Sequence, residues 1–256
     1  MRGEGTLTMI LQHPRDRRNI QQGFTLTELL IAMAMVGIVM AAVYSTYKSQ
    51  QDTYVAQEQV AEMQQNLRAS LYQMARDLRM AGFNPQRAPN VGGFVTQLPD
   101  DGLGETTTDS TNIAFTIDEN KNGSIDLNDN DEQIAYRLDN ATKTLQKFRV
   151  SDDTWLTVAD NIDALDFVYL DPSGTDITDD VIGNPTGLYA ATNLPYLDSI
   201  RSIEISVVAR TGNIDKSFPG TLAYDNQQGD EILAAQGDHR RRRLLTTTIL
   251  CRNMGT

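Results

Sequence analysis

The stretch Gly23-Phe24-Thr25-Leu26-Thr27-Glu28-Leu29-Leu30 opens a long apolar run that continues to Tyr44. From Phe24 to Tyr44 there is one charged residue, Glu28, and no proline. At 1.5 Å per residue, these 21 residues would form a helix of roughly 31 Å, enough to cross the apolar core of a bilayer. The acid falls in the first turn, where the helix dipole tolerates a negative charge best. We therefore expect a membrane-spanning helix over 24–44 with its one charged residue near its N-terminus.

The order of these features resembles the prepilin class III signal of type IV pilins and type II secretion pseudopilins. In that family a membrane peptidase cuts after a glycine and methylates the new N-terminus. The resemblance therefore implies cleavage after Gly23, removal of a leader peptide over 1–23, and methylation of Phe24. It also implies that Glu28 partners the N-terminal amine of a neighbouring subunit.

Two other interpretations compete with the prepilin signal. Ala32-Met33-Ala34 has the small-x-small form of a secretory cleavage site, but cutting there would leave the apolar residues 35–44 as a new terminus. A plain membrane anchor needs neither Gly23 nor Glu28. An acid inside a membrane segment costs a few kcal/mol and usually has a function, which favours the prepilin interpretation.

The leader carries four arginines against one glutamate and one aspartate, a net charge of +2. Positive charge beside the first apolar segment keeps that end in the cytoplasm. We therefore expect a single pass with the body on the far side of the membrane. The resemblance implies that this is the bacterial inner membrane, that the body is periplasmic, and that it later becomes part of an extracellular pilus. Met9 is an alternative start. Removing the leader takes the formal net charge from −12 to −14, which argues against general binding to nucleic acid or anionic lipid.

Beyond Tyr44 the chain becomes polar but keeps a helical period over 45–83. Apolar residues recur at steps of three and four, at Val60, Met63, Leu67, Leu71, Met74 and Leu78. Gly82 offers a left-handed cap and Pro85 follows. We expect one helix from Phe24 to about Ala81, with this amphipathic half packed on a globular domain rather than serving as a partner site.

The end of that helix, Arg76-Asp77-Leu78-Arg79-Met80-Ala81-Gly82-Phe83, resembles PilW-type minor pilins and the related J-type minor pseudopilins. The closing stretches 202–211 and 243–253 resemble PilW-type proteins as well. Major pilins commonly carry a proline about one membrane length into the helix, where this chain has Ser45. That departure suits a minor subunit.

Residues 84–256 are expected to form a globular β-rich domain. Gly-, Pro- and Asp-rich stretches predict long loops at 84–110, 171–197 and 212–238. Short alternating segments predict strands at 113–117, 133–138, 144–150, 155–158, 162–170, 200–209 and 244–251. A helix followed by antiparallel strands is an α+β order, and the resemblance implies a type IV pilin-like fold.

A candidate metal site lies between two of the predicted strands. Residues 118–129 fit the twelve-residue calcium loop, with Gly123 at the sharp turn. The ligands would be Asp118, Asn120, Asn122, Ser124, Asp126 and Asp129. Aspartate replaces the usual glutamate at the last position, and the flanks are strands instead of helices. The alternative is an acidic hairpin turn that binds nothing.

One basic run stands out in this acidic protein, Arg240 to Arg243 after His239. Clustered arginines could neutralise DNA phosphates, although a solvated start of a strand, or pairing with acidic loops of a neighbouring subunit, is the simpler interpretation. Cys251 is the single cysteine, so an intrachain disulfide is impossible. We expect it to be a buried strand residue rather than a free thiol for another chain.

No Cys–His pair, nucleotide-binding glycine loop or histidine cluster points to an enzyme. We expect a PilW-like minor pilin that primes the assembly of a type IV pilus. Its partners would be the prepilin peptidase, other minor pilins and the major pilin, the last two met through the N-terminal helix. The alternatives are a minor pseudopilin of a type II secretion system, a DNA-uptake pilin that uses Arg240–Arg243, and a calcium-binding surface module.

Overall fold

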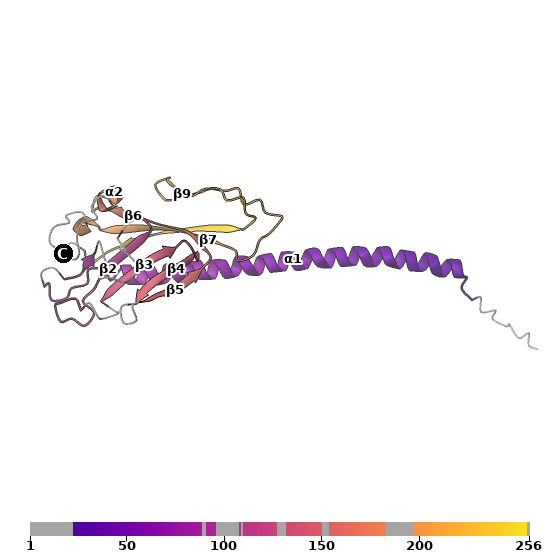
Figure 1. The fold of residues 1–256 in the computed structure, drawn as a ribbon, viewed down its shortest axis with the longest axis horizontal. Coiled ribbons are helices and arrows are strands. Elements are labelled where there is room, and N and C mark those ends of the chain that lie inside the picture. Colours follow the sequence, from indigo (N-terminus) through magenta and orange to yellow (C-terminus); the bar gives the residue numbers. More distant parts are fainter. Residues whose placement is uncertain are drawn as a thin grey trace, which may run out of the picture. The chain divides into compact units, whose positions relative to one another are not determined.

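The computed structural model describes residues 23–88, 91–95, 108, 110–126, 132–149, 154–182 and 197–254 (Figure 1). The chain divides into two compact units, one that ends at Asp52 and one that starts at Thr53. The long helix α1, Leu26–Leu78, contributes residues to both units. Each unit is described separately below.

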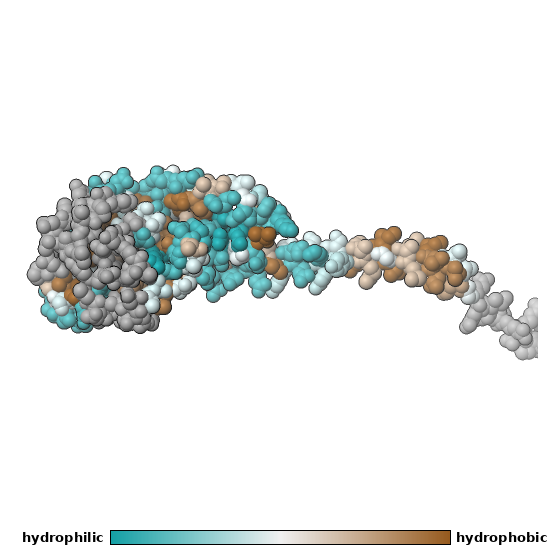
Figure 2. Space-filling model, in the orientation of Figure 1, coloured by the Kyte–Doolittle hydropathy of each residue, from teal (hydrophilic) through white to brown (hydrophobic). Residues whose placement is uncertain are grey.

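In its described residues, the first unit contains the N-terminal part of α1, as far as Asp52. Its composition explains the helix, because alanine, leucine and methionine favour helices and proline is absent. The apolar side chains point outward, from Phe24, which is 92% exposed, to Tyr44, which is 67% exposed. Figure 2 shows these apolar residues gathered along the N-terminal part of α1. By length and composition, this helix contains one segment that could span a membrane, and no residue of that segment is buried.

The second unit begins with the remainder of α1, which packs its apolar stripe into the core. Five of the six predicted stripe residues are buried, and the sixth, Val60, is partly buried against them. The helix ends at Leu78, three residues before the predicted end. Gly82 adopts a left-handed φ of 75°, and a Cβ atom there would lie 2.6 Å from the sulfur of Met254. Glycine is therefore required both by the backbone turn and by packing.

Antiparallel sheets form the rest of this unit. The first sheet has the strand order β1-β2-β3-β4-β5, formed by Gly93–Phe94, Asn112–Thr116, Gln133–Asp139, Thr144–Arg149 and Thr154–Asp160. The second has the order β10-β7-β6, formed by Arg242–Leu250, Ser202–Arg210 and Ile162–Leu170. A small hairpin joins β8, Tyr224–Asp225, to β9, Glu231–Leu233. The predicted α+β class, a long N-terminal helix packed on antiparallel strands, is confirmed.

Each strand predicted from the sequence is present, with its ends shifted by at most two residues. The predicted loops contain short elements that composition did not indicate. Strand β1 lies within 84–110, and the β8–β9 hairpin lies within 212–238. The stretch 171–197 contains the short helix α2, Thr178–Ile182, and the start of a 3-10 turn, Leu197–Ser199.

A buried charge joins the helix to the first sheet. Asp77 on α1 is 6% exposed. Its carboxylate accepts a hydrogen bond of 2.7 Å from the Tyr136 hydroxyl on β3 and another of 2.7 Å from the Lys147 ammonium on β4. The neighbouring Arg76 binds the other carboxylate oxygen at 3.2 Å. These contacts fix the rotation of the helix on the sheet, because a turn of the helix would leave a buried acid without partners.

Candidate functional site

The predicted processing junction lies at the start of α1. Gly23 has no other atom within 4 Å of the place where a Cβ would stand, and Phe24 is almost fully exposed. The backbone on both sides of the predicted cut is therefore uncovered in this chain. Gly23 and Phe24 precede α1 and Glu28 lies in its first turn, while cleavage, methylation and pairing stay predictions.

Thr25 and Glu28 form a reciprocal cap on the first turn. The Thr25 backbone N–H donates to the Glu28 carboxylate at 2.9 Å, and the Glu28 N–H donates to the Thr25 hydroxyl at 3.2 Å. The Thr25 hydroxyl also donates to the same carboxylate oxygen at 2.9 Å. This is a capping box, which satisfies N–H groups that a helix start leaves without partners. The Thr-x-x-Glu spacing is the sequence signal of this cap, and it adds a bond within the chain to the helix-dipole and intermolecular roles expected for Glu28.

The predicted calcium loop lies in the connection between β2 and β3. Both oxygens of Asp118 face the inside of the turn: one accepts from the Asn122 N–H at 3.0 Å and the other from the Gly123 N–H at 3.1 Å. The Asn122 side chain accepts from the Ser124 N–H at 2.8 Å. Gly123 has a left-handed φ of 78°, the conformation expected at the sharp turn.

Five of the six predicted ligand residues belong to this described turn, and Asp129 lies outside the described residues. Among the residues that the structure describes, no group of three or more His, Cys, Asp or Glu gathers as a metal cluster. Calcium binding therefore stays a prediction.

Glu132 was not predicted from the spacing, yet it closes the described part of the loop. Its carboxylate accepts from the Asn120 N–H at 3.3 Å and from the Asp126 N–H at 2.5 Å. Glu132 and Asp118 are both 0% exposed. Neither forms an ion pair with a described cationic side chain. Within the described ranges, backbone N–H groups are the hydrogen-bond donors to these two buried carboxyl groups.

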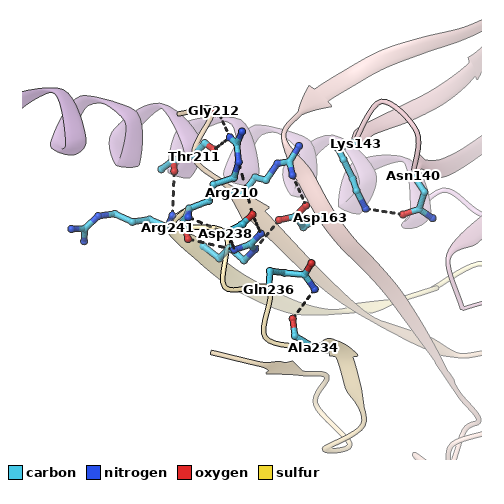
Figure 3. Close-up of polar contacts among 12 residues, drawn as sticks. Asn140, Lys143, Asp163, Arg210, Thr211, Gly212, Ala234, Gln236, Asp238 and Arg241 are labelled. Atoms are coloured by element: carbon cyan, nitrogen blue, oxygen red, sulfur yellow. Dashed lines mark hydrogen bonds and ion pairs between the residues drawn. The ribbon is translucent and has the colours of Figure 1, made fainter. Parts of the chain in front are cut away.

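Most of the predicted anion-binding arginines form hydrogen bonds or ion pairs within the chain. These contacts lie where the long connection between β7 and β10 leaves and rejoins the second sheet (Figure 3). Arg240 donates to the carbonyl oxygens of Thr211 and Gly212. The Arg241 guanidinium pairs with Asp215 at 2.8 Å and lies 5.1 Å from the centre of the Phe218 ring. Both guanidinium groups are thus bonded within the chain, although the Arg240 and Arg241 side chains are still 25% and 40% exposed.

Arg242 is the most buried member of the run, with a side chain 3% exposed. It pairs with Asp163 at 2.7 Å and binds both carboxylate oxygens of Asp238, at 2.7 and 2.6 Å. The hydrogen bonds from Arg242 lower the pKa of Asp238 to about 2. Arg210 adds a contact of 3.2 Å to Asp163. Only Arg243 is exposed, so the basic run is chiefly an internal clamp.

Cys251 directly follows β10 and is 1% exposed. Burial raises the pKa of its thiol to about 12. The thiol is thus kept protonated and away from solvent. The predicted burial is confirmed, but Cys251 lies one residue past the end of β10 instead of within the strand.

Two family models match the sequence of this chain. The family model described as "Prokaryotic N-terminal methylation motif" matches residues 18–44, which include the predicted junction and the apolar part of α1. The model described as "Prepilin peptidase-dependent protein B" matches residues 56–223. Among solved structures, the type IV-like pilin TTHA1219 from Thermus thermophilus is 15% identical with a TM-score of 0.44, covering 76% of this chain and 100% of that chain. The chain matches none of the curated proteins. Because one model covers more than half of its residues, the chain belongs to the family of prepilin peptidase-dependent protein B.

Proposed function

We propose that this protein is a minor pilin, cut after Gly23, methylated at Phe24, and assembled into a type IV pilus through α1. The observation that carries the proposal is the exposed junction at the mouth of an apolar helix, within the residues that match the methylation motif. The protein is a structural subunit in this proposal. Its partners are the prepilin peptidase, other minor pilins and the major pilin.

The properties of α1 explain how one segment can serve in a membrane and then in a filament. Its apolar surface needs an apolar environment on every side, which lipid tails and neighbouring helices both supply. Transfer from the inner membrane to a filament core therefore exchanges one apolar environment for the other. The cost of burying Glu28 is the term that must be offset.

The proposed role of Glu28 is to meet the N-terminal amine of an adjacent subunit. Cleavage after Gly23 creates that amine at Phe24, four residues from the acid. The capping box holds the carboxylate at the helix start through Oε2, and Oε1 accepts no hydrogen bond from the described chain. A cap and an intermolecular pair can therefore exist together.

Two other functions share part of this support. A minor pseudopilin of a type II secretion system would need the same junction and the same helix, so the structure favours neither. The identity of the minor subunits that co-purify with the full chain would separate the two. A DNA-uptake pilin is less favoured, because Arg240, Arg241 and Arg242 are bonded within the chain.

Processing provides the direct test. In cells that contain the peptidase, Gly23→Val should retain the leader, since a branched side chain obstructs access to the backbone at the junction, whereas Gly23→Ala should be cut at least in part. Mass spectrometry of the wild-type chain should find an N-terminal methylated Phe24. A mature terminus at Met35 would show that the chain carries a secretory signal instead.

We also propose that the loop over 118–129 binds calcium and stabilises the β2–β3 connection. The order of oxygen-bearing side chains supports it, as does the burial of two carboxylates that lack a described cationic partner. Asp118, Asn120, Asn122, Ser124, Asp126 and Asp129 would supply the ligands. Two of the residues with side-chain oxygens are neutral amides, so we expect a dissociation constant on the order of 10⁻⁵ to 10⁻³ M.

A further inference from the structure

We propose that the outer edge of β10 pairs with an extended segment of a neighbouring pilin of a different kind, so that the second sheet continues into the partner. The inference rests on the proposed function, since a minor pilin has other pilins as its neighbours. It goes beyond that function by naming the strand that receives the partner and the chemistry of the segment that fits it.

Strand β10 is a long edge strand, drawn in yellow in Figure 1. It pairs with β7 over Arg242–Leu250 in a regular register, and the second sheet ends there. At the two ends of this pairing, the Thr211 N–H donates to the Arg241 carbonyl at 2.9 Å, and the Cys251 N–H donates to the Arg201 carbonyl at 2.8 Å. Because alternate residues of an antiparallel strand face the same neighbour, the odd-numbered residues of β10 direct their main-chain groups at β7.

The even-numbered residues of β10 therefore direct their N–H and C=O groups away from the sheet. In the uncharged part of the strand these are Leu244, Thr246, Thr248 and Leu250. No backbone hydrogen bond joins any of these groups to another described segment. The last three side chains are exposed, and that of Leu250 is 58% exposed. Within the described part of the chain, this edge is open.

The other edges of the two described sheets are short, covered or irregular. Strand β1 has only two residues. The outer edge of β6 is bonded, since the Phe167 N–H donates to the Ser110 carbonyl at 2.8 Å. Strand β5 has a shift in its register with β4, between Leu145 and Gln146, and such bulges bend an edge away from pairing. Residues 244–250 of β10 contain no charge, proline, glycine or bulge, so none of these protections applies to them.

The main chain of this edge determines what can cover it. A row of free N–H and C=O groups is complementary to the same row on another extended segment, which is how strands are added to a sheet. The side chains beside the row are leucine, isoleucine and threonine, which pack well against β-branched and apolar side chains of a paired strand. We therefore infer a partner segment of about seven residues that is extended, uncharged and free of proline at the pairing positions.

The basic run adds a charge to this description. Arg243 directly precedes the uncharged part of β10, its side chain is exposed, and it forms no ion pair with a described residue. The other three arginines of the run are bonded within the chain. An acidic residue at one end of the partner segment would pair with Arg243 and fix the register of the added strand.

The position of β10 in the globular unit is suited to a contact between subunits. Just past this strand, the Asn253 side chain donates to the Arg79 carbonyl at 3.2 Å, next to the end of α1 at Leu78. The edge is thus held against the helix that the proposed function assigns to assembly. A minor subunit is present in few copies, so the segment that reaches this edge belongs to a different pilin.

Photo-cross-linking of the full-length chain tests the pairing. The photoreactive residue p-benzoylphenylalanine would replace Thr246, Thr248 or Leu250, one at a time, in cells that produce the other pilins of the same assembly. Mass spectrometry should find the same pilin attached at all three positions. Each step of two residues along β10 should move the attachment point by two residues along the partner, because paired strands advance together. The same group at Thr157, an exposed position on β5, should give about tenfold less product.

Substitutions at one position separate main-chain pairing from side-chain contact. Thr246→Pro removes an outward N–H and leaves the bonds to β7 in place, as proline does on edge strands. It should lower the yield of the cross-link at Leu250 by about tenfold, whereas Thr246→Ala, which keeps the N–H, should change it little. Thr246→Lys, which keeps the N–H but places a charge on the edge, should also lower the yield and replaces the proline variant if the latter fails to fold.

Four outcomes would overturn the inference. They are attachment points that do not advance with the position on β10, equal yields at Thr157, equal effects of Thr246→Ala and Thr246→Pro, and attachment to a second, differently tagged copy of this chain. Processing is measured in the same cells. If the ordered cross-links are absent while Phe24 is methylated, the pairing is wrong and the proposed function stands. If they form while the mature terminus is Met35, the pairing stands and the proposed processing is wrong.

Discussion

Removal of the buried acid on α1 should weaken the globular unit far more than removal of its exposed neighbour. In a fragment from residue 51 onward, Asp77→Ala deletes two bonds to a charged acceptor, from Tyr136 and Lys147, both at 2.7 Å. Hydrogen bonds to charged groups contribute about 1.5–3 kcal/mol each. Lys147 is 23% exposed and can regain water, so we expect a total loss of about 3 kcal/mol, at the low end for a broken buried pair.

Thermal and urea unfolding measure this loss. For a unit of about this size, 1 kcal/mol corresponds to about 2–4 °C, so the melting temperature should fall by about 6–12 °C. Arg76→Ala is the matched control on the next residue. Its side chain is 67% exposed, and its removal should cost less than about 1 kcal/mol. Equal losses for the two variants would refute the argument that Asp77 locks the helix to the sheet.

The same contact predicts a pH dependence. Burial raises the pKa of Asp77, but the bonds from Lys147 and Tyr136 and the Lys147 charge outweigh it, so the pKa lies below the ordinary value of 3.8. The unfolded chain then takes up a proton at a higher pH than the folded chain does. The stabilisation is therefore complete above the ordinary value and is lost as the pH falls through the folded value. Asp77→Asn should flatten the acid limb of the stability curve.

Three further predictions concern the other sites. Glu28→Ala should be processed normally but enter filaments poorly, while Glu28→Gln, which keeps a cap acceptor, separates the cap from the charge; wild-type incorporation of both would exclude the pairing role. Arg242→Met should destabilise the globular unit by about 2–3 kcal/mol in urea unfolding, because it removes the bonds to Asp238 and leaves buried Asp163 with Arg210 alone, and a loss equal to that of Arg243→Met would contradict the clamp. Millimolar calcium should raise the melting temperature over that in chelator, with a gain in stability of about 2.7 kcal/mol at 100 times the dissociation constant. Asp118→Ala should abolish this rise. An unchanged melting temperature of the wild type would show that the loop is a plain acidic turn.

Local patterns in the sequence were sufficient to predict the long helix and the main strands. The apolar run and the three-and-four spacing predicted α1 to within a few residues, because both depend on nearest neighbours along the chain. Alternation did the same for the strands of both sheets. The division into two sheets was not predictable, since β7 pairs with β10 across a long connection and with β6 on its other side. Neither pairing leaves a mark in the local sequence.

The contacts that the sequence did not predict are those between side chains far apart along the chain. Asp77 reads as an ordinary helix residue, and its partners Tyr136 and Lys147 lie 59 and 70 positions further on. The arginine run looks free for the same reason, because Asp163 is 79 positions before Arg242. The calcium pattern ends at its twelfth position, so it cannot indicate Glu132. In each case the sequence identifies the ionic group but does not predict which distant residue it contacts.

Residues that follow β10 contact the end of α1, and this contact bears on the order in which the chain folds. The Asn253 side chain donates to the Arg79 carbonyl at 3.2 Å, Met254 packs against Gly82, and the Cys251 N–H donates to the Arg201 carbonyl at 2.8 Å. The contacts at the end of α1 can therefore form only after the ribosome has added residues about 170 positions further along the chain. The apolar start of α1 can enter the bilayer long before that moment. If the chain is inserted as proposed, it would be anchored first and folded second, because the globular unit is complete only after β10 and the residues that follow it have been made.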